Sequence, residues 1–419
     1  MASRGQHLVH GDRRFATGGA LVGKLVAPAF AKVLDQIDRR LAKGGIDATL
    51  PDGSKRRIGF RQPGPAAVVR LASWMALVRL VTSGSVGWYK AWTLDEWSSP
   101  DPVTIFELFS SNAVALGDVG RAKGPFRWMN ALAHRLRDNA PGKARANIAA
   151  HYDLGNDFYA AWLDETMTYS SARFASAKDT LEAAQLRKVG MLLDRLDLQP
   201  GQRLLEIGCG WGTLAIEAAT RGVNVVGLTL STEQKAWAER KIAEQGLADF
   251  VEIRLQDYRE MAEQFDAIAS VEMVEAVGER WWGAYLDCIA RNLKPGGRAA
   301  LQFISMNDRL FERYSRNPDF IQTYIFPGGL LLDELRFEAL AKQRGLGWHD
   351  RGSFGGDYAE TLRRWRQRYD GAVAKGRLDD FASEFHDLWR YYLMYCEGGF
   401  RGGAIDVAQV TLTAAQAGH

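Results

Sequence analysis

Leu204-Leu205-Glu206-Ile207-Gly208-Cys209-Gly210-Trp211-Gly212-Thr213 is the stretch that decides the fold of this chain. Residues that suit a buried strand run directly into three alternating glycines, and a helix-like run over residues 214–220 follows. Because glycine has no Cβ, a ligand at such a turn can lie against backbone N–H groups at the helix N-terminus. Many nucleotide-binding folds use a glycine-rich turn, so the stretch alone predicts a ligand site without naming the ligand.

Four further strand-like runs follow, separated by segments with helical apolar spacing. They cover residues 224–229, 250–253, 265–271 and 297–303. This alternation predicts an α/β fold with a doubly wound, mostly parallel sheet. Ligands bind such sheets at the carboxyl ends of the strands, which is where the glycine turn falls.

The pattern resembles the class I S-adenosylmethionine (AdoMet) methyltransferases. A dinucleotide-binding domain is the alternative interpretation. Its third glycine spacing and its acidic residue after the second strand are both missing, and Thr229 ends that strand instead. The methyltransferase interpretation is therefore favoured.

Bulk properties exclude several classes of protein. The 419 residues suffice for one large domain and a smaller one. A net charge of +3 gives no argument for nucleic-acid binding. The three cysteines, Cys209, Cys288 and Cys396, lack metal-site spacing and suit a reducing cytoplasm, so we expect no metal. No run suits a membrane span or a signal peptide, so we expect a soluble or peripheral membrane protein.

The expected organisation has five parts. Residues 1–20 are polar and are expected to be mobile. Residues 21–115 are expected to form a small mixed α+β domain, rich in tryptophan, that contacts lipid or mediates dimerisation. It contains a helix within 21–41 and a hairpin turning at Asp52-Gly53. A linker over 116–150, a catalytic domain with an acyl-chain pocket over 151–413 and a frayed tail over 414–419 complete the chain.

The linker carries seven basic residues and one acidic residue between positions 121 and 145, with aromatic residues interleaved. That combination suits an anionic membrane surface, so we expect a cytoplasmic enzyme at the inner face of the membrane. The alternative is an ordinary solvated helix that packs Trp128 and Leu132 inward.

Further motifs in collinear order resemble the cyclopropane-fatty-acyl-phospholipid synthase family, which includes the mycolic acid cyclopropane synthases. They lie at residues 151–159, 167–171, 204–212, 227–234, 275–278, 324–329, 354–358 and 397–401. The resemblance covers residues 150–412. It implies transfer of a one-carbon unit from AdoMet to a cis double bond of an acyl chain on a membrane phospholipid.

The chemistry of that reaction needs a dry pocket and a base. An alkene is a poor nucleophile, so the sulfonium must be held in line against it. Methyl transfer leaves a carbocation, and a base must remove a proton from the new methyl group before a ring can close. Glu275, just beyond the fourth strand, is the residue we expect to be catalytic. Its alternative role is that of an acid at a helix N-terminus.

In the family a bicarbonate ion is the base, and the resemblance implies which residues hold it. Glu275, Ile304 and Tyr358 match the family pattern. Ser171 replaces the usual cysteine, Gln302 replaces a histidine on the fifth strand, and Ala276 replaces a histidine found in many members. Serine and glutamine can still bind an oxyanion, so bicarbonate stays an expectation. Loss of the histidine nevertheless puts the usual proton relay and ring closure in doubt.

The resemblance also assigns the AdoMet contacts. Tyr169 and Ser170 lie near the methionine end, with Gly208 and Gly210 under it. Thr229, Leu230 and Gln234 meet the ribose and the adenine edge. Asp257 and Tyr258 border adenine, and Val271 lies on its face. A core position is the alternative for Tyr169.

Three competing functions stay open. Without the histidine, the product could be a methyl- or methylene-branched chain that a reductase partner saturates. A methyltransferase acting on a small molecule or RNA is a second alternative, although no nucleic-acid recognition motif is present. A non-enzymatic AdoMet-binding lipid sensor is the third, and intact Glu275 and Tyr358 argue against it.

Overall fold

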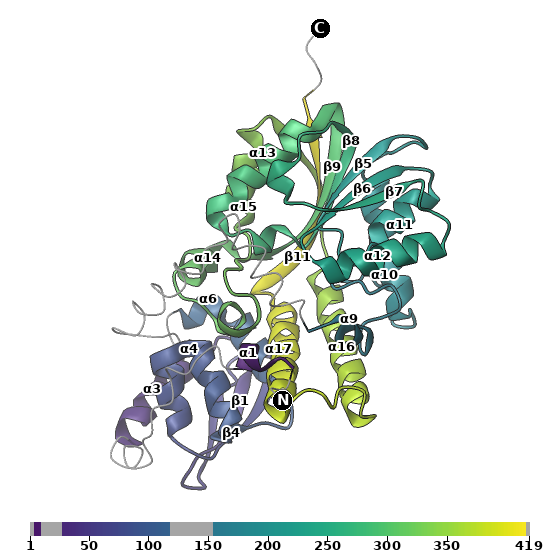
Figure 1. Ribbon diagram of the computed structural model, residues 1–419. Helices are drawn as coiled ribbons and strands as arrows, with labels where there is room; N and C mark the ends of the chain where they lie inside the picture. The colour runs from purple at the N-terminus through teal and green to yellow at the C-terminus, as the bar shows by residue number, and fades with distance from the viewer. Residues whose placement is uncertain (1–3, 10–26, 118–153, 416–419) are drawn as a thin grey trace. The chain divides into compact units, whose positions relative to one another are not determined.

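The structure is a computed structural model that describes residues 4–9, 27–117 and 154–415. Contacts divide the chain into two compact units, each of which is assembled from separate segments (Figure 1). The first comprises residues 1–137, 309–327 and 379–405, and the second comprises residues 138–308, 328–378 and 406–419. The single catalytic domain expected over 151–413 is therefore interrupted, because two of its segments pack with N-terminal residues. Residues 118–150 of the predicted linker lie outside the described residues.

The second unit is built on a seven-stranded sheet in the order β10-β11-β9-β8-β5-β6-β7. Its strands are β5 (Arg203–Ile207), β6 (Asn224–Thr229), β7 (Val251–Leu255), β8 (Phe265–Val271), β9 (Leu293–Met306), β10 (Leu346–Ser353) and β11 (Ile405–Ala414). The five adjacent strands β9, β8, β5, β6 and β7 are parallel to one another, whereas β10 runs antiparallel to β11. The predicted doubly wound, mostly parallel α/β fold is thus confirmed.

Helices cover both faces of this sheet. In Figure 1, α10, α11 and α12 lie on one side of the strands, and α13 and α15 lie on the other. The helices of the unit are α9 (Asn156–Ala160), α10 (Leu181–Asp194), α11 (Thr213–Thr220), α12 (Thr232–Glu244), α13 (Trp282–Asn292), α15 (Glu334–Lys342) and α16 (Gly355–Ala374). Short turns η2 (Tyr258–Glu260), η3 (Val274–Ala276) and η4 (Glu279–Trp281) follow β7 and β8.

The glycine turn joins β5 to α11 as predicted. Leu204 and Leu205 of β5 are fully buried, which fixes the strand in the centre of the sheet. Gly208, Gly210 and Gly212 all have positive φ, which glycine adopts at little cost. The N–H groups of Gly208 and Cys209 donate to the Leu228 carbonyl at 3.0 and 2.9 Å, so the turn is held against β6.

The first unit contains a four-stranded sheet in the order β2-β1-β3-β4. The strands are β1 (Gly45–Thr49), β2 (Lys55–Gly59), β3 (Ala66–Leu71) and β4 (Trp97–Ser98). Its helical elements are α1 (Gln6–Val9), α3 (Ala27–Arg40), α4 (Met75–Thr93), α5 (Pro102–Ser111), α6 (Ala113–Leu116), α14 (Asp308–Ser315), the π-helix η5 (Ile321–Ile325) and α17 (Ser383–Gly402). The hairpin predicted at Asp52-Gly53 is confirmed by the antiparallel pairing of β1 with β2.

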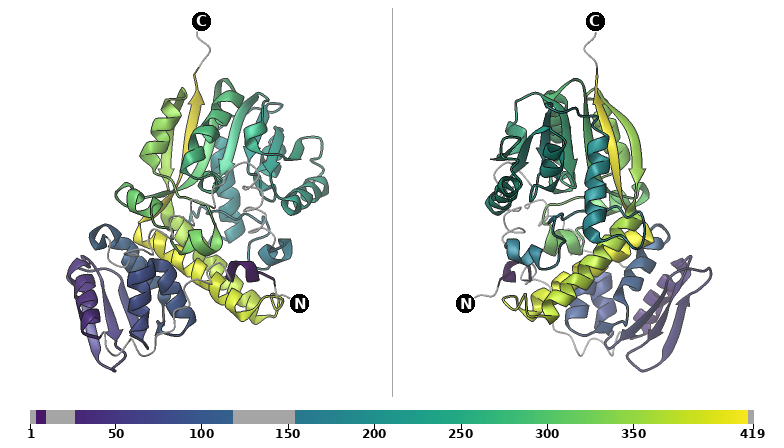
Figure 2. Two further views of the ribbon diagram at one scale, coloured as in Figure 1. Left: turned by 60° about the vertical axis from the view of Figure 1, so that its left-hand side comes forward. Right: turned by 90° about the vertical axis from the view of Figure 1, so that its right-hand side faces the viewer.

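Helix α17 packs closely on α5 within this unit, and Figure 2 shows α17 in yellow beside the blue helices. Glycines make the approach possible. A Cβ at Gly398 would lie 2.4 Å from Phe106 Cβ, and one at Gly402 would lie 2.4 Å from Ser110 Cβ. The small residues of the Glu397–Arg401 motif therefore have a packing role that the sequence did not reveal.

Candidate active site

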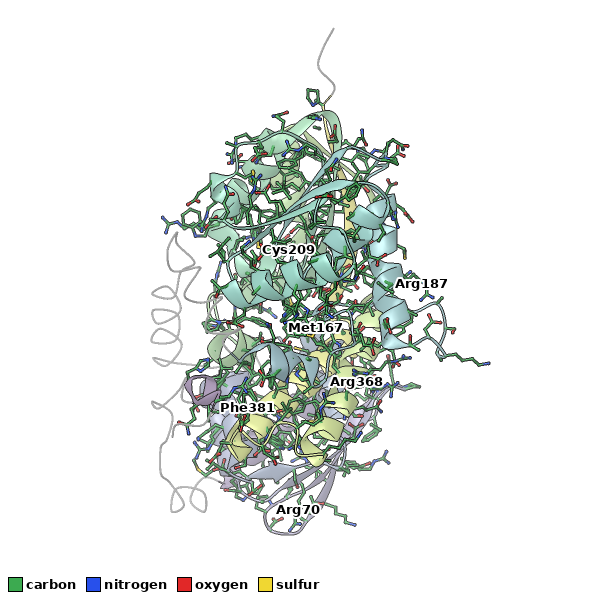
Figure 3. All side chains as sticks on the ribbon, turned by 45° about the vertical axis from the view of Figure 1, so that its right-hand side comes forward. Arg70, Met167, Arg187, Cys209, Arg368 and Phe381 are labelled. Carbon is green, nitrogen blue, oxygen red and sulfur yellow. The ribbon has the colours of Figure 1, made fainter. Side chains whose placement is uncertain are left out.

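The site lies in the second unit, at the carboxyl ends of β5, β8 and β9. Figure 3 labels three residues of the elements around it: Cys209 in the glycine turn, Met167 in the loop before Tyr169, and Arg368 in α16. The loop is tied to α11, because the Thr213 hydroxyl donates to the Thr166 carbonyl. Arg368 holds the preceding segment by donating from Nε to the Trp162 carbonyl at 2.8 Å.

Glu272, the first residue after β8, is the centre of the site. Its backbone has a φ of 48°, a left-handed conformation that is uncommon for a residue with a side chain. Its N–H donates to the Gln302 carbonyl of β9 at 2.7 Å. The strained position directs the carboxylate toward a set of convergent donors.

Three donors bind this carboxylate. The Ser171 N–H donates to Glu272 Oε1 at 2.9 Å, and Gln302 Nε2 donates to the same oxygen at 2.8 Å. The Tyr358 hydroxyl donates to Oε2 at 2.6 Å. Ser171, Gln302 and Tyr358 are residues that the sequence assigned to bicarbonate, but in the structure they bind a carboxylate of the chain itself. Sequence analysis missed Glu272, and the only signal for it was an acid directly after a buried strand.

Glu275, on the turn η3, lies next to this group. Its Oε1 accepts from the Ile304 N–H, so these two predicted site residues are in direct contact. Its Oε2 is buried and has no hydrogen-bond partner among the described residues. Burial, together with the charge of Glu272, raises the pKa of Glu275 to about 8.

The two carboxyl groups differ in their surroundings. Burial also raises the pKa of Glu272, but the hydrogen bonds from Tyr358 and Ser171 and the charge of Lys188 oppose this rise. Paired carboxyl groups in unequal environments divide into one that ionises and one that keeps its proton. The three donors on Glu272, and their absence from Glu275 Oε2, favour ionisation of Glu272 before that of Glu275.

A buried lysine supports the loop that carries Ser170 and Ser171. Lys188 Nζ, on α10, donates to Ser170 Oγ at 2.6 Å, and Gln185 Nε2 donates to the Ser170 carbonyl at 2.8 Å. Burial lowers the pKa of Lys188 to about 8 and raises that of Glu206 to about 8. The sequence analysis did not identify Lys188 or Gln185, because the apolar spacing of a helix does not show which of its polar residues face inward.

The glycine turn offers room for a ligand. A Cβ at Gly210 would meet no heavy atom within 4 Å, whereas one at Gly208 would lie 2.7 Å from Met273 Cγ. At the end of β6, the Thr229 hydroxyl donates to Gln234 Oε1 at 2.9 Å, and both residues are buried. The open turn and this polar pair suit the methionine and ribose ends of AdoMet, respectively.

The remaining predicted AdoMet residues occupy the same edge or its margins. Tyr169 packs against Tyr159 and Trp365, with ring centroids 5.5 and 5.3 Å away. Asp257 forms an ion pair with Arg259 at 2.6 Å, and the Tyr258 hydroxyl is buried without a partner among the described residues. Leu230 directly follows β6, and Val271 is the last residue of β8. Both are partly exposed.

Two features that the described residues lack bear on other chemistry. No group of three or more histidine, cysteine, aspartate or glutamate side chains within those ranges could hold a metal ion. None of the helices described there combines the length and apolar character that crossing a membrane requires.

Comparison with known proteins agrees with this geometry. The family model described as mycolic acid cyclopropane synthetase matches residues 140–410. The chain belongs to this family. It is therefore an AdoMet-dependent methyltransferase that modifies lipids, as the resemblance implied.

Three members of the family are similar to this chain over most of their own length. The chain is 39% identical to the tuberculostearic acid methyltransferase UfaA1 of Mycobacterium tuberculosis over 80% of both chains. It is 36% identical to the cyclopropane-fatty-acyl-phospholipid synthase of Escherichia coli, over 80% of this chain and 85% of the relative. The structure of mycolic acid cyclopropane synthase CmaA1 complexed with SAH and CTAB matches 64% of this chain and 98% of its own, with a TM-score of 0.61 and 33% identity.

Proposed function

We propose that this enzyme transfers the methyl group of AdoMet to a cis double bond in a phospholipid acyl chain and leaves a methylene-branched chain. The observation that carries the proposal is the Glu272 carboxylate, bound by Ser171, Gln302 and Tyr358. A fixed carboxylate in this position can serve as the base that the reaction requires.

The reaction balances with this one base. The alkene π electrons attack the methyl carbon, the carbon–sulfur bond breaks, and S-adenosylhomocysteine leaves. The methyl group is now on one carbon and the cation on its neighbour. A hydride shift moves the cation to the methyl-bearing carbon, where it is tertiary. Glu272 then takes a proton from the methyl group, and the electrons of that C–H bond form the C=CH2 double bond of the methylene branch.

The side chains divide this work. Ionised Glu272 stabilises the cation by its charge and removes the proton. Tyr358 and Gln302 hold its two oxygens in place. Protonated Glu275 adds no second negative charge, and its buried Oε2 has no hydrogen-bond partner among the described residues. AdoMet, held at the glycine turn, supplies the electrophilic methyl group.

The branched product is favoured over a ring because of the basicity of Glu272. Both products require removal of a proton from the same methyl group, so the order of that step and the hydride shift decides between them. Three hydrogen bonds stabilise the charged carboxylate, so Glu272 is a weaker base than an equally buried glutamate without these donors would be. Slower deprotonation gives the hydride shift time to occur. The 39% identical relative, a tuberculostearic acid methyltransferase, supports this choice.

A cyclopropane product is the second candidate. Glu275, Ile304 and Tyr358 keep the family pattern, and the Escherichia coli cyclopropane-fatty-acyl-phospholipid synthase supports this outcome. Bicarbonate does not fit as these residues stand, because three of the groups expected to hold it bind Glu272 instead. No step of the proposal passes through bicarbonate.

The test is turnover of the full chain with methyl-deuterated AdoMet and vesicles of cis-unsaturated phospholipid, with the lipid read by mass spectrometry. We expect a product that gains one carbon, retains two of the three deuterium atoms and takes up hydrogen on catalytic hydrogenation. A product with the same label that resists hydrogenation would establish the cyclopropane instead. Absence of labelled lipid would refute both candidates.

The proposed reaction also implies a partner enzyme and a location at the membrane. A methylene-branched product requires a reductase partner if the final chain is saturated. The substrate is part of a membrane, so we propose peripheral association with the inner face, through the basic segment that lies outside the described residues. We further propose that the first unit contributes lipid contacts or a dimer interface.

A further inference from the structure

Gln302 can hold Glu272 only in one of its two amide orientations. A primary amide has a donor end and an acceptor end of nearly the same shape, and a half-turn exchanges them. The observed orientation places Nε2 2.8 Å from Glu272 Oε1. The reversed orientation would direct an oxygen at an ionised carboxylate and repel it.

The other end of Gln302 is bound by a second buried amide. Gln409 lies on β11, the strand next to β9 in the sheet, and only 2% of its surface is exposed. Its Nε2 donates to Gln302 Oε1 at 3.1 Å. Gln302 is therefore correctly oriented only if Gln409 is correctly oriented too.

Helix α10 and Arg195, the residue that follows it, fix the orientation of Gln409. The Lys188 carbonyl accepts from Gln409 Nε2 at 3.3 Å, and Arg195 Nε donates to Gln409 Oε1 at 3.2 Å. A backbone carbonyl can only accept, and a guanidinium group can only donate. In a reversed Gln409 the NH2 group would face the donating guanidinium of Arg195, and the amide oxygen would face the accepting carbonyl of Lys188.

We infer that Arg195 and Gln409 are positioning residues that fix the Gln302 amide with its donor end toward Glu272. The chain Arg195–Gln409–Gln302–Glu272 has one direction, because each member donates to the next or sets which end of the next one donates. The effect on catalysis rests on the proposed role of Glu272 as the base. The orientation itself depends only on these contacts.

The side chains of Arg195, Gln409 and Gln302 do not change protonation near neutral pH. Amides carry no ionisable proton, and a guanidinium keeps its charge. A histidine at position 302, the residue that the family pattern carries, would change protonation near neutral pH. The titratable groups that face Glu272 are Glu275 on η3, Tyr358 on α16 and Lys188 on α10. Gln302 therefore acts as a donor whose strength does not change with pH.

The test compares Gln409→Leu with Thr411→Val in the full chain. Thr411 is a matched control, since it lies two positions along the same strand, is 2% exposed and accepts from Arg195 Nη1 at 3.4 Å without contacting Gln302. The Glu272 carboxyl group is titrated by NMR in protein labelled with carbon-13 at the glutamate carboxyls, with Glu272→Gln assigning the signal. Turnover with AdoMet and unsaturated vesicles is measured across pH in parallel.

In Gln409→Leu we expect the Glu272 midpoint to rise by about one pH unit, because the ionised form loses its oriented donor. Turnover at neutral pH should fall about tenfold with little change in the KM for AdoMet. Thr411→Val should match the wild type in both measurements. Arg195→Leu, which leaves the buried strand unchanged, should shift the midpoint in the same direction.

An unshifted midpoint in Gln409→Leu and Arg195→Leu would overturn the inference. If Gln409→Leu fails to fold, Arg195→Leu decides alone. Failure of the proposed function gives a different result. In that case Glu272→Gln keeps full turnover, while the midpoint of Glu272 still shifts when Gln409 is replaced.

Discussion

The Tyr358 hydroxyl donates a 2.6 Å hydrogen bond to Glu272 Oε2, between residues 86 positions apart in the sequence. Tyr358 lies in the first turn of α16, and Glu272 directly follows β8. A charge-assisted bond of this length stabilises the ionised carboxylate more strongly than a neutral pair would. The fold therefore places a carboxylate of the chain itself where the resemblance implied a bound bicarbonate ion.

Replacing Glu272 by Gln should remove the base and keep the shape of the side chain. We expect turnover to fall by about 10²- to 10⁴-fold, which is the usual contribution of a general base, with AdoMet affinity little changed. Glu239→Gln, on the exposed face of α12, is the control and should keep wild-type turnover. Full activity of Glu272→Gln would refute the assignment.

The pH dependence should follow the raised pKa of Glu272. Burial disfavours its charged form, so the base loses activity as pH falls through a value above that of an ordinary glutamate. Tyr358→Phe removes a donor that favours the charged form, and we expect the acid limb of kcat/KM to move to higher pH. A limb that stays in place or moves to lower pH would contradict the role of the tyrosine.

Two glycines of the turn should respond differently to alanine. Gly210→Ala adds a Cβ in open space, at a φ of 53°, so we expect a loss of about 1 kcal/mol of stability. Its AdoMet affinity should fall about tenfold or more, because the ligand can no longer approach the backbone. Gly208→Ala also meets Met273 Cγ at 2.7 Å and should lower the melting temperature further. Calorimetric binding of AdoMet that is unchanged in Gly210→Ala would count against this ligand site.

Neighbouring glycines of α17 provide a test of packing in the first unit. In Gly398→Ala the new Cβ would lie 2.8 Å from backbone atoms of Val103 and Glu107 on α5, so we expect a loss of about 1–3 kcal/mol. In Gly399→Ala the nearest atom is the flexible end of Ile405 at 3.1 Å, and better helix propensity should offset this contact. Equal unfolding temperatures for the two variants would contradict the packing argument.

The basic segment over 121–145 predicts how the enzyme meets its substrate. If its charges bind anionic lipid, sedimentation with anionic vesicles should weaken as salt is raised, since salt screens exposed charges. Neutral vesicles are the control and should bind less at low salt. Binding that does not respond to salt would favour the alternative of an ordinary solvated helix.

The sequence by itself determined the sheet, the glycine turn and the family. Alternating strand and helix patterns are local, and the pairings of β5 to β9 follow from them. The meeting of Glu275 with Ile304, and of Ser171, Gln302 and Tyr358 at one point, could also be predicted from motifs. The region of 68–81 could not, because its apolar run suits both a strand and a helix, and it divides into β3 and α4.

Only the tertiary structure decided which acid occupies the centre of the site. Glu272 and Glu275 are three residues apart, and local sequence does not show which carboxylate faces the donors. The backbone conformation after β8 directs Glu272 there, while Glu275 turns to Ile304. Gln409 on β11 contacts Gln302, and Arg195 after α10 contacts Gln409, so their roles exist only after the sheet has formed. Hydrogen-bond direction is a property of three-dimensional neighbours, and for that reason residue types alone could not supply it.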